Sequence, residues 1–159
     1  FYGQIQKKWL KKTLSQSKAK FKIIASSVPF SKGIKPGSKD PWDGYPEERE
    51  EIFSFIEKEK IEGVLLIAAD RHRIDLRKTE RVNGYDLFEF VSGRLTNRHV
   101  HSVIKTEGLI WGYNKTCGFC LLRFDTRKVN SQVKLEAYDN EGKLLFAQKI
   151  MANDLKFTD

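Results

Sequence analysis

The chain has 159 residues, of which 40% are hydrophobic and 31% are charged. This composition excludes an intrinsically disordered chain and suits one globular domain. The 29 Lys and Arg residues exceed the 21 Asp and Glu residues by a formal charge of +8, which favours anionic partners such as phosphate compounds, nucleic acids or acidic surfaces, although a mildly basic solvated surface is the simpler explanation.

The chain opens inside an amphipathic segment. Ile5, Trp9 and Leu14 recur at helical spacing, so we expect a helix over residues 3–16. Because the first residue is Phe1 and not a methionine, we expect a fragment or processed product of a longer protein. No apolar run is long enough to span a membrane, and no basic-then-apolar signal segment opens the chain.

A short strand, a long loop and a second helix are expected next. The run FKIIASS from Phe21 suits a buried strand. The loop FSKGIKPGSKDPWDGYP that follows has a length often seen in functional loops. The second helix is expected to start at Pro46, a residue suited to the first helical position, and to bury Ile52, Phe53 and Ile56.

The segment EGVLLIAAD shows no polar alternation, which predicts a central strand that is covered on both faces, as parallel strands are. The strand–helix–strand order predicts an α/β part over residues 1–79. In such sheets, binding sites lie beyond the carboxyl ends of the strands. Asp70 and His72 would lie at such an end.

After Thr79 the chain has the pattern of successive strands, namely YDLFEFVSG, CGFCLLRFD, QVKLEAYD and KLLFAQKI. The turn DNEG predicts a hairpin over residues 132–150. We therefore expect a mainly β part over residues 80–159 within a single domain or fragment. Cys117 and Cys120 form a C-x-x-C pair inside one of these strands, where packing is favoured over redox or zinc chemistry.

The Asp-x-His pair at the strand end could bind a metal. Asp70 offers a carboxylate oxygen and His72 an imidazole nitrogen, which suit zinc, iron or manganese. An Asp that caps a turn and an exposed His are the structural alternatives. Arg71 and Arg73 could bind phosphate oxygens through their planar donor forks, although solvated arginines are commoner.

Three further motifs carry weaker signals. His99 and His101, in HVH, would point both rings to one face of an extended chain, as a metal pair or simply as part of a polar loop. DPWDGYPEER contains Asp43 and Tyr45, and a capped helix start explains much of it. The basic residues of the first helix, Lys7 to Lys12, could bind nucleic acid, but no accompanying nucleic-acid motif is present.

The segment KDPWDGYPEEREEIFSFIEKEKIEGVLLIAADRHRIDL resembles the carboxyl-terminal part of PhoD-like metallophosphatases, the alkaline phosphatase D type. The resemblance rests on D-x-W-D-G-Y-P-x-x-R-E, a helix, and an apolar strand that ends in a motif similar to G-D-x-H. It extends to QKKWLKKTLSQSKAKFKIIASSVPF, LFEFVSGRLTN, NKTCGFCLLRFD and the closing hairpin, and so covers essentially the whole chain.

The resemblance implies the carboxyl-terminal half of a four-layer α/β/β/α metallophosphatase-type sandwich. It implies hydrolysis of phosphate monoesters or diesters by metal-activated water, with iron and calcium as the metals, and export from the cytoplasm. Asp70 matches the metal-binding acid of the motif and His72 its histidine, and we expect Arg71, Arg73 and His72 to act on the phosphate, with Asp43 and Tyr45 positioning the substrate.

Two departures from the family pattern affect this expectation. The motif glycine is Ala69 here, where a methyl group could crowd the backbone. The family's other metal ligands, a cysteine, aspartates and an asparagine, belong to an amino-terminal half that this chain does not contain. We therefore expect the isolated chain to be inactive. The alternative is a degenerate or excised basic module that binds an anionic ligand or nucleic acid without catalysis.

Overall fold

The computed structural model describes residues 1–96, 98–127 and 129–158. Asn97, the last residue of the family-like segment LFEFVSGRLTN, therefore lies outside the described residues. The helices are α1 (Gln4–Gln16) and α2 (Pro46–Lys58), with the 3-10 turns η1 (Trp42–Gly44) and η2 (Ala152–Leu155). None of the helices in these ranges is long and apolar enough to cross a membrane. Both predicted α-helices are confirmed to within one residue at their starts.

Five strands form the first sheet in the order β1-β2-β4-β3-β5. Their bounds are β1 Lys22–Ala25, β2 Val64–Ala68, β3 Ile74–Thr79, β4 Leu87–Val91 and β5 Leu109–Tyr113. β2 is parallel to both of its neighbours, as its unbroken apolar sequence predicts. β3 runs antiparallel to β4 and β5. This sheet takes strands from both sides of residue 79.

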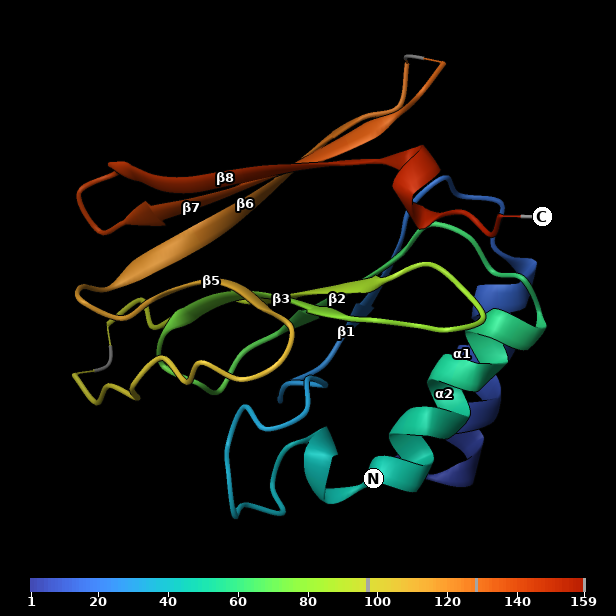
Figure 1. Cartoon of the computed structure of the whole chain (residues 1–159), viewed down its shortest axis with the longest axis horizontal. Helices are drawn as coiled ribbons and strands as arrows, with labels where there is room; N and C mark the ends of the chain where they lie inside the picture. The colour runs from blue at the N-terminus through green and yellow to red at the C-terminus, as the bar shows by residue number, and fades with distance from the viewer. Residues whose placement is uncertain (97, 128, 159) are drawn as a thin grey trace.

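The second sheet is an antiparallel meander of β6 (Gly118–Asp125), β7 (Gln132–Asp139) and β8 (Leu144–Met151). β7 and β8 pair as a hairpin around the predicted DNEG turn. In Figure 1 the two α-helices lie on one side of the first sheet and the second sheet lies on the other. The described chain is therefore a mixed α/β protein in three layers, helices, five-stranded sheet and three-stranded sheet.

The sequence patterns do not predict β3 and β5. β3 reads IDLRKT, and its charged residues interrupt the apolar pattern of a buried strand. In the structure Asp75 and Arg77 are nevertheless fully buried, because they neutralise each other inside the protein. β5 reads LIWGY, a short apolar run that is not among the strands predicted from the sequence, and in the structure all of its residues remain partly or largely exposed.

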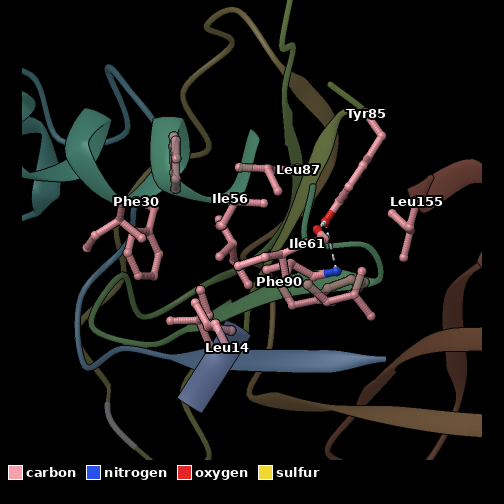
Figure 2. Close-up of a cluster of buried hydrophobic side chains, with 14 of the residues drawn as sticks. Leu14, Phe30, Ile56, Ile61, Tyr85, Leu87, Phe90 and Leu155 are labelled. Carbon is pink, nitrogen blue, oxygen red and sulfur yellow. Dashed lines mark hydrogen bonds between the residues drawn. The ribbon is translucent and has the colours of Figure 1, made fainter. Parts of the chain in front are cut away.

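One hydrophobic core joins all three layers. It includes residues from α1, α2, β2 and β4, and residues of the second sheet such as Leu135. Figure 2 shows part of this core, with Leu14, Ile56 and Leu87 among its side chains. Burying these apolar surfaces stabilises the fold by roughly 1.5–3 kcal/mol for each large side chain. The carboxyl end of β2 is therefore anchored in a well-packed interior.

A buried tyrosine fixes the entry of the chain into β2. The hydroxyl of Tyr85 donates to the carbonyl of Ile61 (2.7 Å) and accepts from the amide of Val64 (3.0 Å); Figure 2 shows both bonds. Burial raises the pKa of the Tyr85 hydroxyl well above its ordinary value. The tyrosine thus satisfies two backbone groups that the helix–strand connection leaves unpaired.

We predict that Tyr85→Phe lowers the free energy of unfolding by about 1–3 kcal/mol, because two buried backbone groups lose their partner. Urea denaturation measures the change. Tyr113→Phe is the matched control, since the Tyr113 hydroxyl contacts only the exposed Thr116 hydroxyl among the described hydrogen bonds. Equal stability of the Tyr85→Phe variant and the wild type would contradict the role assigned to this hydroxyl.

Candidate metal centre

A strained turn follows the carboxyl end of β2. The amide of Arg71 donates to the carbonyl of Ala69 (2.9 Å) across Asp70, whose φ is 69°. A hydrogen bond between residues i and i+2 around a positive φ is the pattern of a γ-turn, which is strained for non-glycine residues. His72 also has a positive φ, 47°. Each such residue costs about 1–3 kcal/mol and persists only where neighbouring structure holds it.

The end of β4 holds this turn. The amide of Ser92 donates to the carbonyl of Ala68 (2.9 Å), and Gly93 packs directly against the chain at Arg73. A β-carbon on Gly93 would lie 2.8 Å from a side-chain carbon of Ile74 and 3.0 Å from the carbonyl carbon of Arg73. Glycine allows this close approach because it has no β-carbon. Ser92 and Gly93, in the segment VSGRLTN, therefore support the turn that presents Asp70.

A buried ion triad lies directly beyond the turn, on β3 and its amino-terminal flank. Asp75 accepts from Arg73 Nε at both carboxylate oxygens (3.0 Å each), and from Arg73 Nη2 at Oδ2 (2.9 Å). Arg77 Nε donates to the same Oδ2 at 3.0 Å. All three side chains are 0–1% exposed. Such a triad is stable only when its hydrogen bonds are complete, because desolvation of each charge is expensive.

The triad also fixes the loop that carries HVH. Arg73 Nη1 donates to the carbonyl of Ser102 (2.7 Å). Arg77 donates from Nη2 to the carbonyl of Ile104 and from Nη1 to the hydroxyl of Thr106, both at 2.9 Å. Three points of this loop are thus bound to buried guanidinium groups. The HVH segment immediately before them is placed by the same bonds.

The long loop between β1 and α2 is bound to the same face of the sheet. Glu89 accepts from the amides of Phe30 (2.6 Å) and Ser31 (2.8 Å), and from the Ser31 hydroxyl. Burial raises the pKa of the Glu89 carboxyl, and its hydrogen bonds oppose that rise. Arg73 Nη2 also lies 3.4 Å from the carbonyl of Ile34. The loop is therefore a fixed part of the structure around the turn.

All three histidines of the chain meet beside the turn. His72, His99 and His101 each offer a ring nitrogen, and these atoms lie within 4.8 Å of one another. The ring centroids of His99 and His101 are 4.6 Å apart. The ring centroid of His72 lies 5.5 Å from that of His99 and 5.4 Å from that of His101. Burial, and then the charge of Arg71, lower the pKa of His101. The alternate spacing of HVH thus does bring its two rings together.

Asp70 and Arg71 leave polar atoms uncommitted. Asp70 Oδ2 lies 3.7 Å from Arg71 Nη1 and 3.9 Å from Lys35 Nζ, which are ion-pair distances and not hydrogen bonds. Within the described ranges, Asp70 Oδ2 and the Nε and Nη1 atoms of Arg71 are buried without hydrogen-bond partners. Arg71 is 3% exposed, and burial lowers its pKa. These atoms are available to a ligand.

The other predicted site residues have local partners. Arg73 directs its donors into the triad. Asp43 accepts from the amide of Gly33 (2.9 Å) and lies 3.4 Å from Arg49 Nη1, which orders η1 and the start of α2. Tyr45 is 43% exposed and its ring packs edge-on against Phe1. The structure thus places Asp70 beside Arg71 and His72 with His99 and His101, and it gives Arg73, Asp43 and Tyr45 structural contacts.

Ala69, which replaces the family glycine, has no positive φ and is exposed. It borders a largely apolar cleft of about 250 Å³ between the two sheets, whose walls include Ile67, Phe90 and Leu122. The positive φ values fall instead on Asp70 and His72. The methyl group is therefore accommodated without backbone strain at its own position.

The basic face of α1 is partly neutralised by α2. Lys7 lies 2.7 Å and Lys11 2.6 Å from carboxylate oxygens of Glu51, and Lys7 lies 3.3 Å from Glu48. The pKa values of both glutamates are lowered; hydrogen bonds from Lys11 and Lys7 do this at Glu51. These contacts leave α1 with less free positive charge than its sequence indicates, which weakens the case for a nucleic-acid interface.

Comparison with known proteins identifies relatives of most of the chain. A family model described as PhoD-like phosphatase matches residues 1–144. Alkaline phosphatase D of Bacillus subtilis (strain 168) is 31% identical over an alignment 90 residues long, with a coverage of 48% of this chain and 15% of that protein. A solved structure of PhoD matches with a TM-score of 0.54 and 19% identity, over 93% of this chain and 35% of that one. The chain thus spans a minor part of both relatives, and the solved structure shows the likeness of the fold.

We predict that Asp75→Asn lowers the free energy of unfolding by about 3–5 kcal/mol, because two buried arginines lose their counter-charge. Urea denaturation measures the loss. Asp86→Asn is the control: its carboxylate pairs with the partly exposed Lys78 at 2.8 Å, and such pairs contribute about 1 kcal/mol or less. Similar losses for the two variants would show that the triad does not anchor the fold.

Proposed function

The chain belongs to the PhoD-like phosphatase family, and we propose that it is part of a metal-dependent phosphatase or phosphodiesterase. The observation that carries this proposal is the set of uncommitted polar atoms at the end of β2. Asp70 Oδ2 lies 3.7 Å from Arg71 Nη1, and in the described part of the chain neither this oxygen nor the Nε and Nη1 atoms of Arg71 have hydrogen-bond partners. The carboxylate oxygen suits a cation and the guanidinium an oxyanion.

The donor set fits a metal ion. Asp70 supplies a carboxylate oxygen and His72 an imidazole nitrogen, both from a turn whose backbone is held by β4. A metal ion held by Asp70 and His72 would lower the pKa of its bound water towards neutrality and would stabilise negative charge on a phosphoryl group. We propose that the remaining ligands come from other parts of the whole protein, as in the family pattern, and that they complete the four-layer sandwich.

Arg71 is proposed to bind the phosphoryl oxygens of the substrate. Its Nε and Nη1 atoms have no hydrogen-bond partner within the described ranges, and a guanidinium offers parallel donors that match two oxygens of a phosphate. Arg73 is proposed to position the turn, because its donors are bound to Asp75 and Ser102. Asp43 is proposed to hold the neighbouring loop, and Tyr45 the start of α2, near the substrate.

This assignment favours an enzyme over a module that only binds an anion. A pure anion site needs positive donors, whereas Asp70 places a buried negative oxygen at the same point. That carboxylate would repel a phosphate, and although Arg71 Nη1 and Lys35 Nζ lie 3.7 and 3.9 Å from it, a metal ion bound to it would provide the direct positive charge that a phosphate needs there. The proposed 159-residue part alone is expected to be inactive, because Asp70 and His72 supply only part of a metal coordination sphere.

In the whole, metal-loaded protein, Asp70→Asn should lower kcat/KM for aryl phosphate monoesters and diesters by at least about 100-fold, because metal-ion charge stabilisation is lost. A colorimetric assay measures the change. Asp86→Asn is the control, since it removes a partly exposed carboxylate that lies just before β4. Undiminished hydrolysis by the Asp70→Asn variant would refute the assignment. Binding of an aryl phosphate by the wild type without hydrolysis would favour the anion-binding alternative.

Arg71→Ala should lower kcat/KM for the same substrates by about 10- to 100-fold, the effect of losing one hydrogen bond to a charged group of about 1.5–3 kcal/mol. Inorganic phosphate should also inhibit the Arg71→Ala variant less strongly than it inhibits the wild type, which the same assay measures. Arg127→Ala, which removes a 91% exposed side chain, should change neither value. An Arg71→Ala variant with wild-type phosphate inhibition would show that Arg71 does not contact the anion.

A further inference from the structure

The three histidines form a ligand set that neither the family resemblance nor the Asp-x-His motif assigns. We propose that His72, His99 and His101 form a three-imidazole site for a borderline divalent cation such as Zn²⁺, which this chain can hold by itself. This proposal goes beyond phosphate ester hydrolysis, because it concerns metal binding by described residues alone. It shares only His72 with the proposed phosphatase site.

The convergence of the three rings is the first observation. The chain contains no other histidine, yet these three come from the turn after β2 and from the HVH loop, and their ligand atoms lie within 4.8 Å of one another. Tetrahedral zinc with bonds of about 2.0–2.1 Å to nitrogen needs ligand atoms about 3.3 Å apart. Each ring therefore needs to move by only about 1 Å, which side-chain rotation supplies.

The second observation is that neighbouring structure holds the backbone segments that carry the three rings. His72 lies in the strained turn that Gly93 and Ser92 hold. The HVH loop is bound by buried arginines just beyond it, through the carbonyl of Ser102. Asn114 adds a hydrogen bond from Nδ2 to the carbonyl of His101 (3.2 Å). Both halves of the site are thus fixed to the five-stranded sheet before any ion binds.

The chemistry of the donors selects the ion. Imidazole nitrogen suits zinc, copper, nickel and iron, whereas calcium and magnesium require oxygen ligands. Three protein nitrogens leave one tetrahedral position open, which is the pattern of zinc sites that bind water or substrate. Arg71 precedes His72 in the turn, and its buried Nε and Nη1 atoms have no hydrogen-bond partner within the described ranges. An anion is therefore the expected occupant of the open position.

The test is a Zn²⁺ titration of the 159-residue chain without an affinity tag, by calorimetry, after treatment with a chelator. We expect one Zn²⁺ per chain, with Ca²⁺ at least about 100-fold weaker. Because the chain has three histidines, a proton–nitrogen correlation spectrum of the imidazoles should show all three rings shifting together. Thermal unfolding with and without Zn²⁺ gives a second readout, since bound metal raises Tm.

His99→Asn and His101→Asn should each weaken Zn²⁺ binding by more than about 100-fold, which exceeds the effect of changes outside the ligand shell. Val100 lies between these two histidines, and the Val100→Ser variant keeps both rings, so this variant should bind Zn²⁺ like the wild type. The double variant Cys117→Ser, Cys120→Ser should also bind normally. Loss of binding in that double variant, or wild-type binding in either histidine variant, would overturn the proposal, as would a wild-type chain that binds no Zn²⁺.

Asp70→Asn separates this site from the proposed phosphatase centre. It should abolish most hydrolysis by the whole protein while the chain still binds Zn²⁺ through its three histidines. His99→Asn should abolish Zn²⁺ binding by the chain whatever its effect on hydrolysis. If Asp70→Asn removed Zn²⁺ binding and His99→Asn did not, the ion would belong to the Asp70 and His72 pair, and the three-imidazole site would be refuted.

Discussion

Asp75 is buried between two buried arginines, and the bonds of this triad connect three separate segments of the chain. A carboxylate taken out of water must be compensated by complete hydrogen bonding, and here Arg73 and Arg77 both bind it. The donors left over on the two arginines reach the HVH loop and the long loop before α2. The electrostatic requirement of one side chain therefore determines where two irregular segments lie.

The strained turn depends on the same surroundings. Positive φ values at Asp70 and His72 cost conformational energy, which the packing of Gly93 and the bonds around Arg73 offset. A hydrogen bond from Ser92 holds the turn on one side, and the triad holds it at Arg73 on the other. Asp70, Arg71 and His72 are thus presented on a rigid support, which reduces the entropy lost when a ligand binds.

His72 has a special place, because it belongs to both proposed ligand sets. With Asp70 it offers a mixed oxygen and nitrogen pair, which suits the family's metal chemistry. With His99 and His101 it offers nitrogen only, which suits a softer ion. Arg71 stands between Asp70 and His72 in the turn, and its Nη1 lies 3.7 Å from Asp70 Oδ2. An anion bound there would be attracted by the arginine and by whichever cation is present, so the charge pattern is consistent with phosphate as the ligand.

The sequence by itself determined the two helices, the buried parallel strand, the closing hairpin and the family, because each depends on local periodicity or on a contiguous motif. It also identified Asp70 and His72 as the charged end of β2. Only the tertiary structure decided which arginine is available. Arg71 and Arg73 have the same chemistry and flank the same histidine, but Asp75 engages one and leaves the other free of hydrogen bonds at two of its nitrogen atoms. The position of His72 beside His99 and His101 likewise depends on long-range hydrogen bonds from Arg73 to Ser102 and from Arg77 to Ile104. Such bonds produce no periodic pattern in the sequence, so the sequence could not predict them.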